Sequence, residues 1–153
     1  MRKAIVVYTS MSGNTLEMAE SIVEGLQQGR IEVVLKDVLD TSAQELVLYD
    51  CIVLGSYTWG EGDLPDEYLP FYRDMKNLNL QGIRGAVFGS GDLAYNLFAA
   101  AVDQLRDRLV YCGVEMAMFS LKIDRTPSEF QLQECERFGL SLAAKLNKAG
   151  LVC

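Results

Sequence analysis

A run of hydroxyl, amide and glycine residues, Ser10-Met11-Ser12-Gly13-Asn14-Thr15, lies between two apolar patterns. The apolar segment before it, residues 4–8, predicts a strand buried on both faces. Apolar residues at helical spacing over 16–26 predict a helix after it. The first N–H groups of a helix are unpaired and attract anions, and the hydroxyls and the amide add further donors. The loop therefore suits a phosphate group.

The loop contains no Lys or Arg. A nucleotide-hydrolysing loop would need Gly-Lys-Ser/Thr, so a nest of neutral donors fits this sequence better. Without a cation in the loop, we expect phosphate binding to depend only weakly on salt. The alternative is a polar turn that caps a helix and binds nothing.

Two later loops are also unusual. Residues 57–65 follow the apolar run 50–56 and contain Trp59, the only tryptophan, with two glycines and two acids. Residues 89–95, Gly-Ser-Gly-Asp-Leu-Ala-Tyr, follow the apolar run 83–88. A phosphate at the first loop, with Trp59 and Tyr95 from the others, describes a flat phosphorylated ring between two aromatic side chains. The alternatives are a core position for Trp59 and a helix-capping position for Tyr95.

The elements that carry these loops alternate between apolar runs and amphipathic helical patterns, which indicates βαβ units on a parallel sheet. We expect strands at 4–8, 31–36, 50–56, 83–90 and 114–121, with 31–36 at an edge because it alternates most. Helical segments are expected at 16–26, 41–48, 66–76 and 97–109, the last closed by Gly113. A final helix follows Thr126-Pro127-Ser128-Glu129, which has the pattern of a capping box with proline at the first helical position.

The position of the loops follows from this order of elements. Ligands of an open parallel sheet bind beyond the carboxyl ends of the strands, where the strand order reverses. All three unusual loops leave from that edge, so we expect them to form one site.

Composition limits the class of protein. With 153 residues, half of them apolar and 23% charged, the chain is expected to form one domain over residues 1–153. The net charge of −7 argues against nucleic acid and anionic membranes and favours partners with basic surfaces. No apolar run is long enough for a signal peptide or a membrane span, so we expect a cytoplasmic protein.

The absence of histidine excludes Ser-His-Asp and Cys-His catalysis and histidine metal sites. The four cysteines are widely spaced and form no Cys-x-x-Cys pair, so we expect reduced thiols rather than a disulfide framework or a metal site. They are Cys51, Cys112, Cys135 and Cys153.

Taken together, the three loops resemble those of flavodoxins. The matching motifs are Ser10-x-Ser12-Gly13-Asn14-Thr15, Ser56-x-Thr58-Trp59-Gly60-x-Gly62 and Phe88-Gly89-Ser90-Gly91-Asp92-x-x-Tyr95. The resemblance covers the whole chain, and the uninterrupted segment 114–121 is similar to that of short-chain members. It implies an α/β fold in which helices cover both faces of a doubly wound, five-stranded parallel sheet of order 2-1-3-4-5. It also implies non-covalently bound FMN.

The resemblance further implies roles for single residues. Ser10, Ser12, Asn14 and Thr15 would hold the FMN phosphate, helped by the N–H groups of Met11 and Gly13. Trp59 would cover the inner face of the ring and Tyr95 the outer face. Thr58 and Gly60 would line its inner edge, and Asp92 would meet the pyrimidine end, which Gly91 lets the backbone approach. The candidate site is completed by Ser56, Tyr57 and Ser90.

The implied function is low-potential one-electron transfer by a monomer, between a flavin- or ferredoxin-type reductase and acceptor proteins. No catalytic residue is needed, because the chemistry belongs to the flavin. Acids near the site, Glu61, Asp63, Asp66 and Glu67, would lower the flavin potential and attract basic partners; the alternative is a merely solvated face.

Two other classes of protein share this architecture. An FMN-dependent NAD(P)H:quinone or azo reductase shares this architecture but needs room over the flavin, which Trp59 and Tyr95 would close. A phosphoacceptor domain needs acids after the first strand, where the sequence has Tyr8-Thr9-Ser10.

Overall fold

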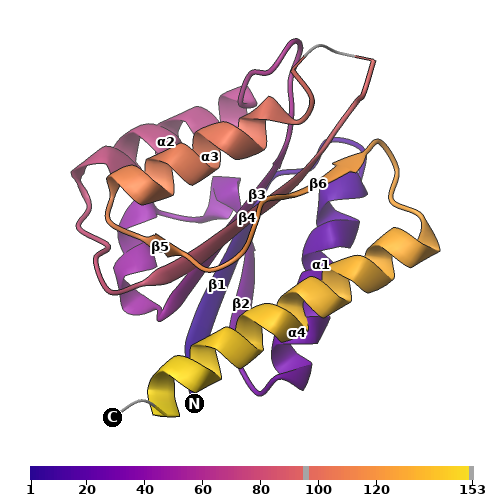
Figure 1. The fold of residues 1–153 in the computed structure, drawn as a ribbon. Coiled ribbons are helices and arrows are strands. Elements are labelled where there is room, and N and C mark those ends of the chain that lie inside the picture. Colours follow the sequence, from indigo (N-terminus) through magenta and orange to yellow (C-terminus); the bar gives the residue numbers. More distant parts are fainter. Residues whose placement is uncertain (95–96, 152–153) are drawn as a thin grey trace.

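The computed structural model describes residues 1–94 and 97–151, which form a parallel sheet between two layers of helices (Figure 1). The strand order β2-β1-β3-β4-β5 confirms the predicted order 2-1-3-4-5. A sixth strand, β6, also pairs with β4. As predicted, β2 lies at an edge. The strands are β1 (Lys3–Tyr8), β2 (Glu32–Asp37), β3 (Cys51–Tyr57), β4 (Arg84–Gly91), β5 (Glu115–Met116) and β6 (Leu121–Asp124).

The central strands are buried on both faces, which is why their sequences are continuous apolar runs. In β1, Ile5 and Val7 belong to the core on one face of the sheet. Ala4 and Val6 belong to the core on the other face. Val6 lies opposite Leu35 of β2 and Val53 of β3, so β1 occupies the interior of the sheet.

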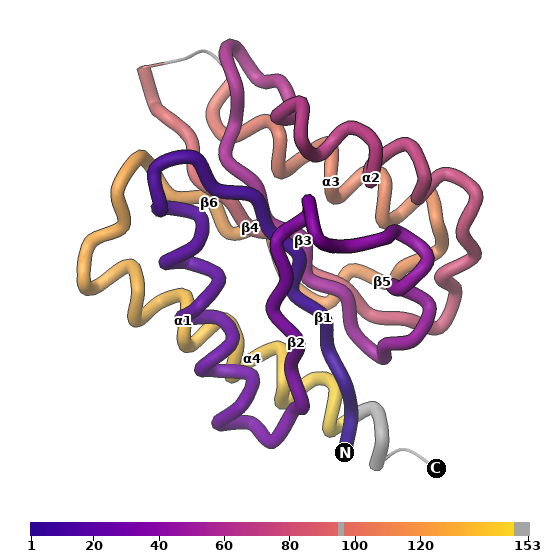
Figure 2. Tube along the Cα trace, turned by 180° about the vertical axis from the view of Figure 1, so that it is seen from behind, coloured from indigo at the N-terminus to yellow at the C-terminus, as the bar shows by residue number. Residues whose placement is uncertain are grey.

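One face of the sheet is covered by α1 (Asn14–Gln28) and α4 (Glu129–Leu151), and the other by α2 (Leu69–Asp74) and α3 (Ala100–Tyr111) (Figures 1 and 2). The predicted helical segment 66–76 consists of α2 between two 3₁₀ turns, Asp66–Tyr68 and Met75–Asn77. The predicted crossing at 41–48 is a 3₁₀ helix, Ala43–Leu48, and another 3₁₀ turn, Val38–Asp40, follows β2.

The predicted strand at 114–121 is divided in the structure. β5 pairs with the start of β4, and β6 pairs with residues 88–91 at its carboxyl end. Residues 117–120 leave the ladder, and the Phe119 side chain is 96% exposed. An edge strand makes ladder hydrogen bonds on one side only, so such a departure loses few of them. The last strand therefore ends at Asp124 rather than at 121.

Two helix starts also differ from the prediction. Ser128 Oγ accepts a hydrogen bond from Gln131 N at 3.1 Å, and Ser128 N donates to Gln131 Oε1 at 2.9 Å. The capping box of α4 is therefore Ser128 and Gln131, not Thr126 and Glu129, and Pro127 precedes the cap. The helix predicted over 97–109 begins only at Ala100, because Ala99 has a left-handed φ of +47°.

The C-terminal end of that helix follows the prediction. Gly113 comes directly after the cap residue Cys112, has a φ of +100° and donates its N–H to the Val110 carbonyl oxygen at 3.0 Å. A left-handed glycine of this kind commonly ends a helix.

Cys51, Cys112 and Cys135 are buried free thiols, whereas Cys153 lies outside the described residues. Burial raises the pKa of Cys51 to about 12, so this thiol stays protonated. Within residues 1–94 and 97–151, no group of three or more His, Cys, Asp or Glu side chains is arranged to hold a metal. None of the helices in the same ranges has the length and apolarity to span a membrane.

Candidate functional site

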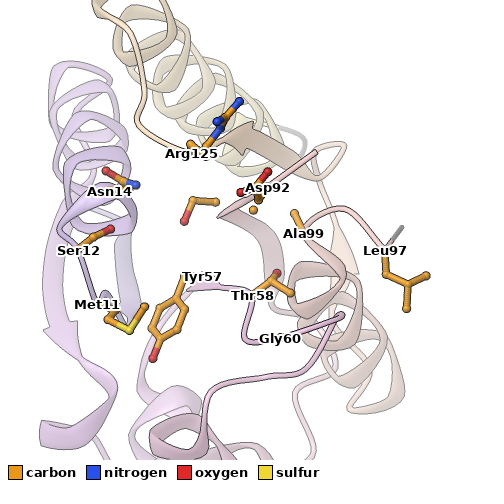
Figure 3. Close-up of a pocket in the computed structure, with 12 residues that line it drawn as sticks. Met11, Ser12, Asn14, Tyr57, Thr58, Gly60, Asp92, Leu97, Ala99 and Arg125 are labelled. Carbon is orange, nitrogen blue, oxygen red and sulfur yellow. The ribbon is translucent and has the colours of Figure 1, made fainter. Parts of the chain in front are cut away.

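A pocket lies at the carboxyl edge of the sheet, where the loops after β1, β3 and β4 meet (Figure 3). All three predicted loops contribute to its wall, together with the start of α3 and the residue after β6. The lining residues are Met11, Ser12, Asn14, Tyr57, Thr58, Gly60, Ser90, Gly91, Asp92, Leu97, Ala99 and Arg125.

The loop after β1 presents its donors toward this pocket. Ser10 Oγ accepts hydrogen bonds from the N–H groups of Gly13 at 3.0 Å and Leu16 at 3.4 Å, which leaves the hydroxyl proton free to donate. Gly13 precedes α1 with a φ of +91°, a conformation that favours glycine, and has no side chain to cap the helix. The remaining N–H groups of the first turn are thus available to a bound anion.

Two of the predicted hydroxyl ligands lie under the pocket and are bonded within the protein. Thr15 is buried, and its Oγ1 is 3.1 Å from Ser90 Oγ, which joins the first loop to the end of β4. Ser56 is also buried, and its hydroxyl donates to the Tyr57 carbonyl oxygen at 2.6 Å. These contacts hold the loops in position.

The loop after β3 is a tight hairpin around the tryptophan. Trp59 N donates to the Asp63 carbonyl oxygen at 2.7 Å, and Asp63 N donates to that of Trp59 at 2.8 Å. Gly60 and Gly62 between them have φ angles of +54° and +118°. The Trp59 residue is 52% exposed, so it is not a core aromatic. Its side chain belongs to a second pocket, which shares Met11 and Tyr57 with the first.

The acids near this hairpin are not equivalent. Glu61, Asp63 and Asp66 are exposed, but Glu67 accepts hydrogen bonds from Tyr57 Oη at 2.6 Å and Thr9 Oγ1 at 3.3 Å. The Tyr57 hydrogen bond is the main cause that holds the pKa of Glu67 below its ordinary value. Burial, reinforced by the same bond, raises the pKa of Tyr57. Glu67 is therefore a structural carboxylate rather than part of a solvated acidic face.

The loop after β4 approaches the start of α3 closely. A Cβ atom at Gly91 would lie 2.7 Å from Ala99 N, so this position requires glycine. The loop is also tied to the end of β6, because Leu93 N donates to Asp124 Oδ1 at 2.9 Å. This hydrogen bond is the main cause that lowers the pKa of Asp124. Tyr95, the predicted cover of the outer ring face, lies outside the described residues.

Three lining residues were not predicted from the sequence: Leu97, Ala99 and Arg125. The apolar pattern places Leu97 in a helix, but α3 begins only at Ala100. The same pattern ends the last strand at 121, which separates Arg125 from the sheet edge, whereas β6 continues to Asp124. Had that strand been extended through Ile123 and Asp124, the residue after it would have fallen at the same sheet edge as the other loops.

The hydrogen-bond donors of the loops, and the open space beside the backbone at Gly13 and Gly60, fit FMN. Hydroxyls, an amide and helix N–H groups suit a phosphate, and a Cβ at Gly13 or Gly60 would meet little besides open space. A doubly wound parallel sheet with these loops at its carboxyl edge defines an α/β protein that binds a phosphorylated planar ligand.

Comparison with known proteins identifies the family. The flavodoxin family model matches residues 6–139. The chain is 42% identical over 146 residues to probable flavodoxin 2 of Bacillus subtilis, covering 95% of this chain and 97% of that one. It is 37% identical over 149 residues to the flavodoxin of Maridesulfovibrio salexigens, covering 95% and 100%.

A solved structure agrees with these matches. Oxidised flavodoxin 2 from Bacillus cereus superposes with a TM-score of 0.90 at 44% identity, covering 94% of this chain and 99% of that one. The chain belongs to the flavodoxin family. Flavodoxins bind FMN, transfer electrons between redox partner proteins and are not enzymes in themselves; this chain is accordingly an FMN-binding electron carrier.

Proposed function

We propose that the three loops at the carboxyl edge of the sheet hold FMN as the family resemblance implies. The phosphate binds at residues 10–15, and the ring lies between the loop 56–60 and the loop 90–95. Ser10, Ser12, Asn14 and Thr15 contact the phosphate, whereas Ser56 and Ser90 fix the loops that carry the ligands. Trp59 and Tyr95 cover the two faces of the ring.

The observation that carries this proposal is the single pocket shared by the three loops. Ser12 and Asn14 line it on one side, and Thr58, Gly60 and Asp92 line it on the other (Figure 3). When bound, FMN supplies the redox chemistry, while the protein orients it and limits the access of water.

Titration of the apoprotein tests the assignment of the phosphate end. The Ser12→Ala and Asn14→Ala variants each remove one hydrogen bond to the charged phosphate, which contributes about 1.5–3 kcal/mol. Each is expected to weaken FMN binding by about 10- to 150-fold and to leave riboflavin binding nearly unchanged. Ser141→Ala, an exposed substitution on α4, is the control. Equal losses for FMN and riboflavin would place these side chains elsewhere than at the phosphate.

We further propose that the carrier works as a monomeric single domain of residues 1–153 in the cytoplasm, with partners that dock through basic surfaces, such as a flavin- or ferredoxin-type reductase. The net charge of −7 and the exposed acids Glu61, Asp63 and Asp66 near the pocket support the proposal that the partners have basic docking surfaces. Reduction by such a reductase should slow as ionic strength rises, and sedimentation should give a monomer mass. Rapid NAD(P)H oxidation by the isolated FMN-loaded protein would instead favour the quinone or azo reductase function.

A further inference from the structure

We propose that Arg125 is a cationic ligand of the FMN phosphate. The protein would then bind the phosphate through an ionic contact as well as through hydrogen bonds from neutral donors. The inference rests on the proposed phosphate position at residues 10–15. It assigns a phosphate contact to a residue outside the three loops.

The backbone holds Arg125 at the rim of the pocket. Its N–H donates to the Gly91 carbonyl oxygen at 2.6 Å, and the residue directly before it, Asp124, is paired with Gly91 in the sheet. Arg125 has a φ of +53°, in the left-handed region that non-glycine residues seldom adopt. Such a conformation persists only where the surroundings enforce it. The start of this side chain is therefore fixed beside the ligand site.

The guanidinium group is free to engage a ligand. The side chain is 70% exposed, and its contact with the Asp124 carboxylate is 3.3 Å long. An exposed ion pair of this kind holds its partners only weakly. In Figure 3, Arg125 and Asn14 lie on the same side of the pocket, with Met11 and Tyr57 opposite, and the Arg125 guanidinium points away from the pocket. To contact a phosphate, this exposed side chain has to turn inward past Asp92.

The charges at the site favour a phosphate as its partner. Among the described residues that line the pocket, Arg125 is the only cation, and the loop 10–15 supplies neutral donors alone. A phosphate monoester carries about −1.5 to −2 charges at pH 7. The planar guanidinium matches phosphate oxygens with two parallel N–H groups, which makes it a better partner than a carboxylate pair on the surface.

A competing role for Arg125 is neutralisation of the acids around it. Asp92 lines the same pocket, and Asp124 is its direct neighbour. If Arg125 only balanced these carboxylates, its loss would affect every flavin equally. If it binds the phosphate, its loss affects FMN and spares riboflavin, which has no phosphate.

The test measures dissociation constants of the apoprotein for FMN and riboflavin, by quenching of flavin fluorescence, at low and high salt. The variants are Arg125→Gln, Arg125→Lys and Arg125→Asn; asparagine tolerates the left-handed φ, which keeps the fold if glutamine does not. Arg106→Gln removes the same charge from an exposed position on α3 and is the control.

We expect Arg125→Gln and Arg125→Asn to weaken FMN binding about tenfold, as for a hydrogen bond to a charged group, and riboflavin binding less than twofold. The FMN affinity of both variants should depend less on salt than that of the parent, and Arg125→Lys should be intermediate. The preference for FMN should also shrink below about pH 6, where the phosphate takes up a proton, and should shrink less in the two neutral variants.

Equal loss of FMN and riboflavin, or an unchanged FMN affinity, would overturn the assignment of Arg125. Failure of the parent protein to prefer FMN over riboflavin would instead overturn the proposed phosphate site itself, so the two failures are distinguishable.

Discussion

At the scale of single residues, Glu67 is an acid near the site whose side chain stabilises the fold instead of forming part of a docking surface for partners. Its carboxylate accepts hydrogen bonds from Tyr57 Oη and Thr9 Oγ1, which lie at the ends of β3 and β1. From sequence, Glu67 looked like its neighbours Glu61 and Asp66. Only the packing of two strand ends against the 3₁₀ turn at 66–68 distinguishes it.

This role makes stability depend on pH in a defined direction. The Tyr57 hydrogen bond lowers the pKa of Glu67 in the folded protein. Stability from this carboxylate is therefore complete above the ordinary glutamate pKa of about 4.3 and is lost as the pH falls through the lower folded-state pKa.

We expect Glu67→Gln to be less stable than the parent at pH 7 and to lose less stability between pH 5 and pH 3. Urea denaturation at several pH values measures this, with Glu24→Gln on an exposed part of α1 as the control. A parallel pH dependence of the parent and Glu67→Gln would contradict the role given to this carboxylate.

The site residues differ in how far the sequence could predict them. Ser12, Asn14, Thr58 and Asp92 line the pocket as expected, because each belongs to a loop that directly follows a buried strand. Thr15 has the same side-chain chemistry as Ser12, but its place on the first turn of α1 directs it against Ser90. Sequence spacing alone does not separate the two.

At the scale of elements, the contact between α1 and α4 depends on glycine. A Cβ atom at Gly25 would collide with the Glu136 carbonyl oxygen, and one at Gly139 with that of Ile22. The two backbones therefore pack directly against each other on one face of the sheet (Figure 2).

Gly139→Ala is expected to destabilise the protein by about 1–3 kcal/mol or more, because α1 and α4 must move apart. Ser141→Ala, on the exposed face of the same helix, should change the free energy of unfolding by less than about 0.5 kcal/mol. Denaturant midpoints measure both. A Gly139→Ala variant as stable as the parent would show that the helices can separate without loss.

The start of α4 gives a second test at this scale. Because Ser128 and Gln131 form the capping box, Ser128→Ala should cost about 1 kcal/mol, whereas Thr126→Ala should cost little. Thermal denaturation of the two variants compares them directly. A larger loss of stability for Thr126→Ala than for Ser128→Ala would instead indicate that Thr126 and Glu129 form the capping box.

The strands show why only part of the fold could be predicted. β1, β3 and β4 are buried on both faces, so their apolar runs mark their positions closely. The last strand lies at an edge of the sheet, where it is hydrogen-bonded on one side only and side chains such as Phe119 are exposed. Its residues therefore need not be apolar, and the apolar pattern marks its ends poorly. Its interruption at 117–120 and its extension to Asp124 left no signal in the apolar pattern.

At the scale of the whole molecule, charge is distributed unevenly around the site. The exposed acids Glu61, Asp63 and Asp66 lie on or next to the Trp59 hairpin, whereas Arg125 lies at the end of β6. The acids therefore flank the Trp59 hairpin, and the cation lies at the rim of the pocket beside Gly91 of β4. A basic partner drawn to the acids would approach the end of the flavin from which electrons are exchanged.

Changing Glu61, Asp63 and Asp66 together to Gln, Asn and Asn tests this arrangement, with Glu67 left in place because it holds the strand ends. At roughly 10 Å, one unit charge changes an electrostatic energy by about 0.4–1.7 kcal/mol as the effective dielectric falls from ~80 to ~20. Since ~59 mV corresponds to about 1.4 kcal/mol for one electron, each acid lowers the potential of the second electron by about 20–70 mV.

In the triple variant, the reduction potential for adding the second electron to bound FMN should therefore be higher. Its reduction by a basic reductase should be slower and less dependent on ionic strength. Redox titration measures the first effect, and stopped-flow reduction across a salt series measures the second. The matched control changes three exposed acids away from the pocket, Glu115, Glu134 and Glu24, to glutamine, which alters net charge equally. If the control slows reduction as much as the triple variant does, net charge steers the partner; only a larger effect of the triple variant assigns docking to the face beside Trp59.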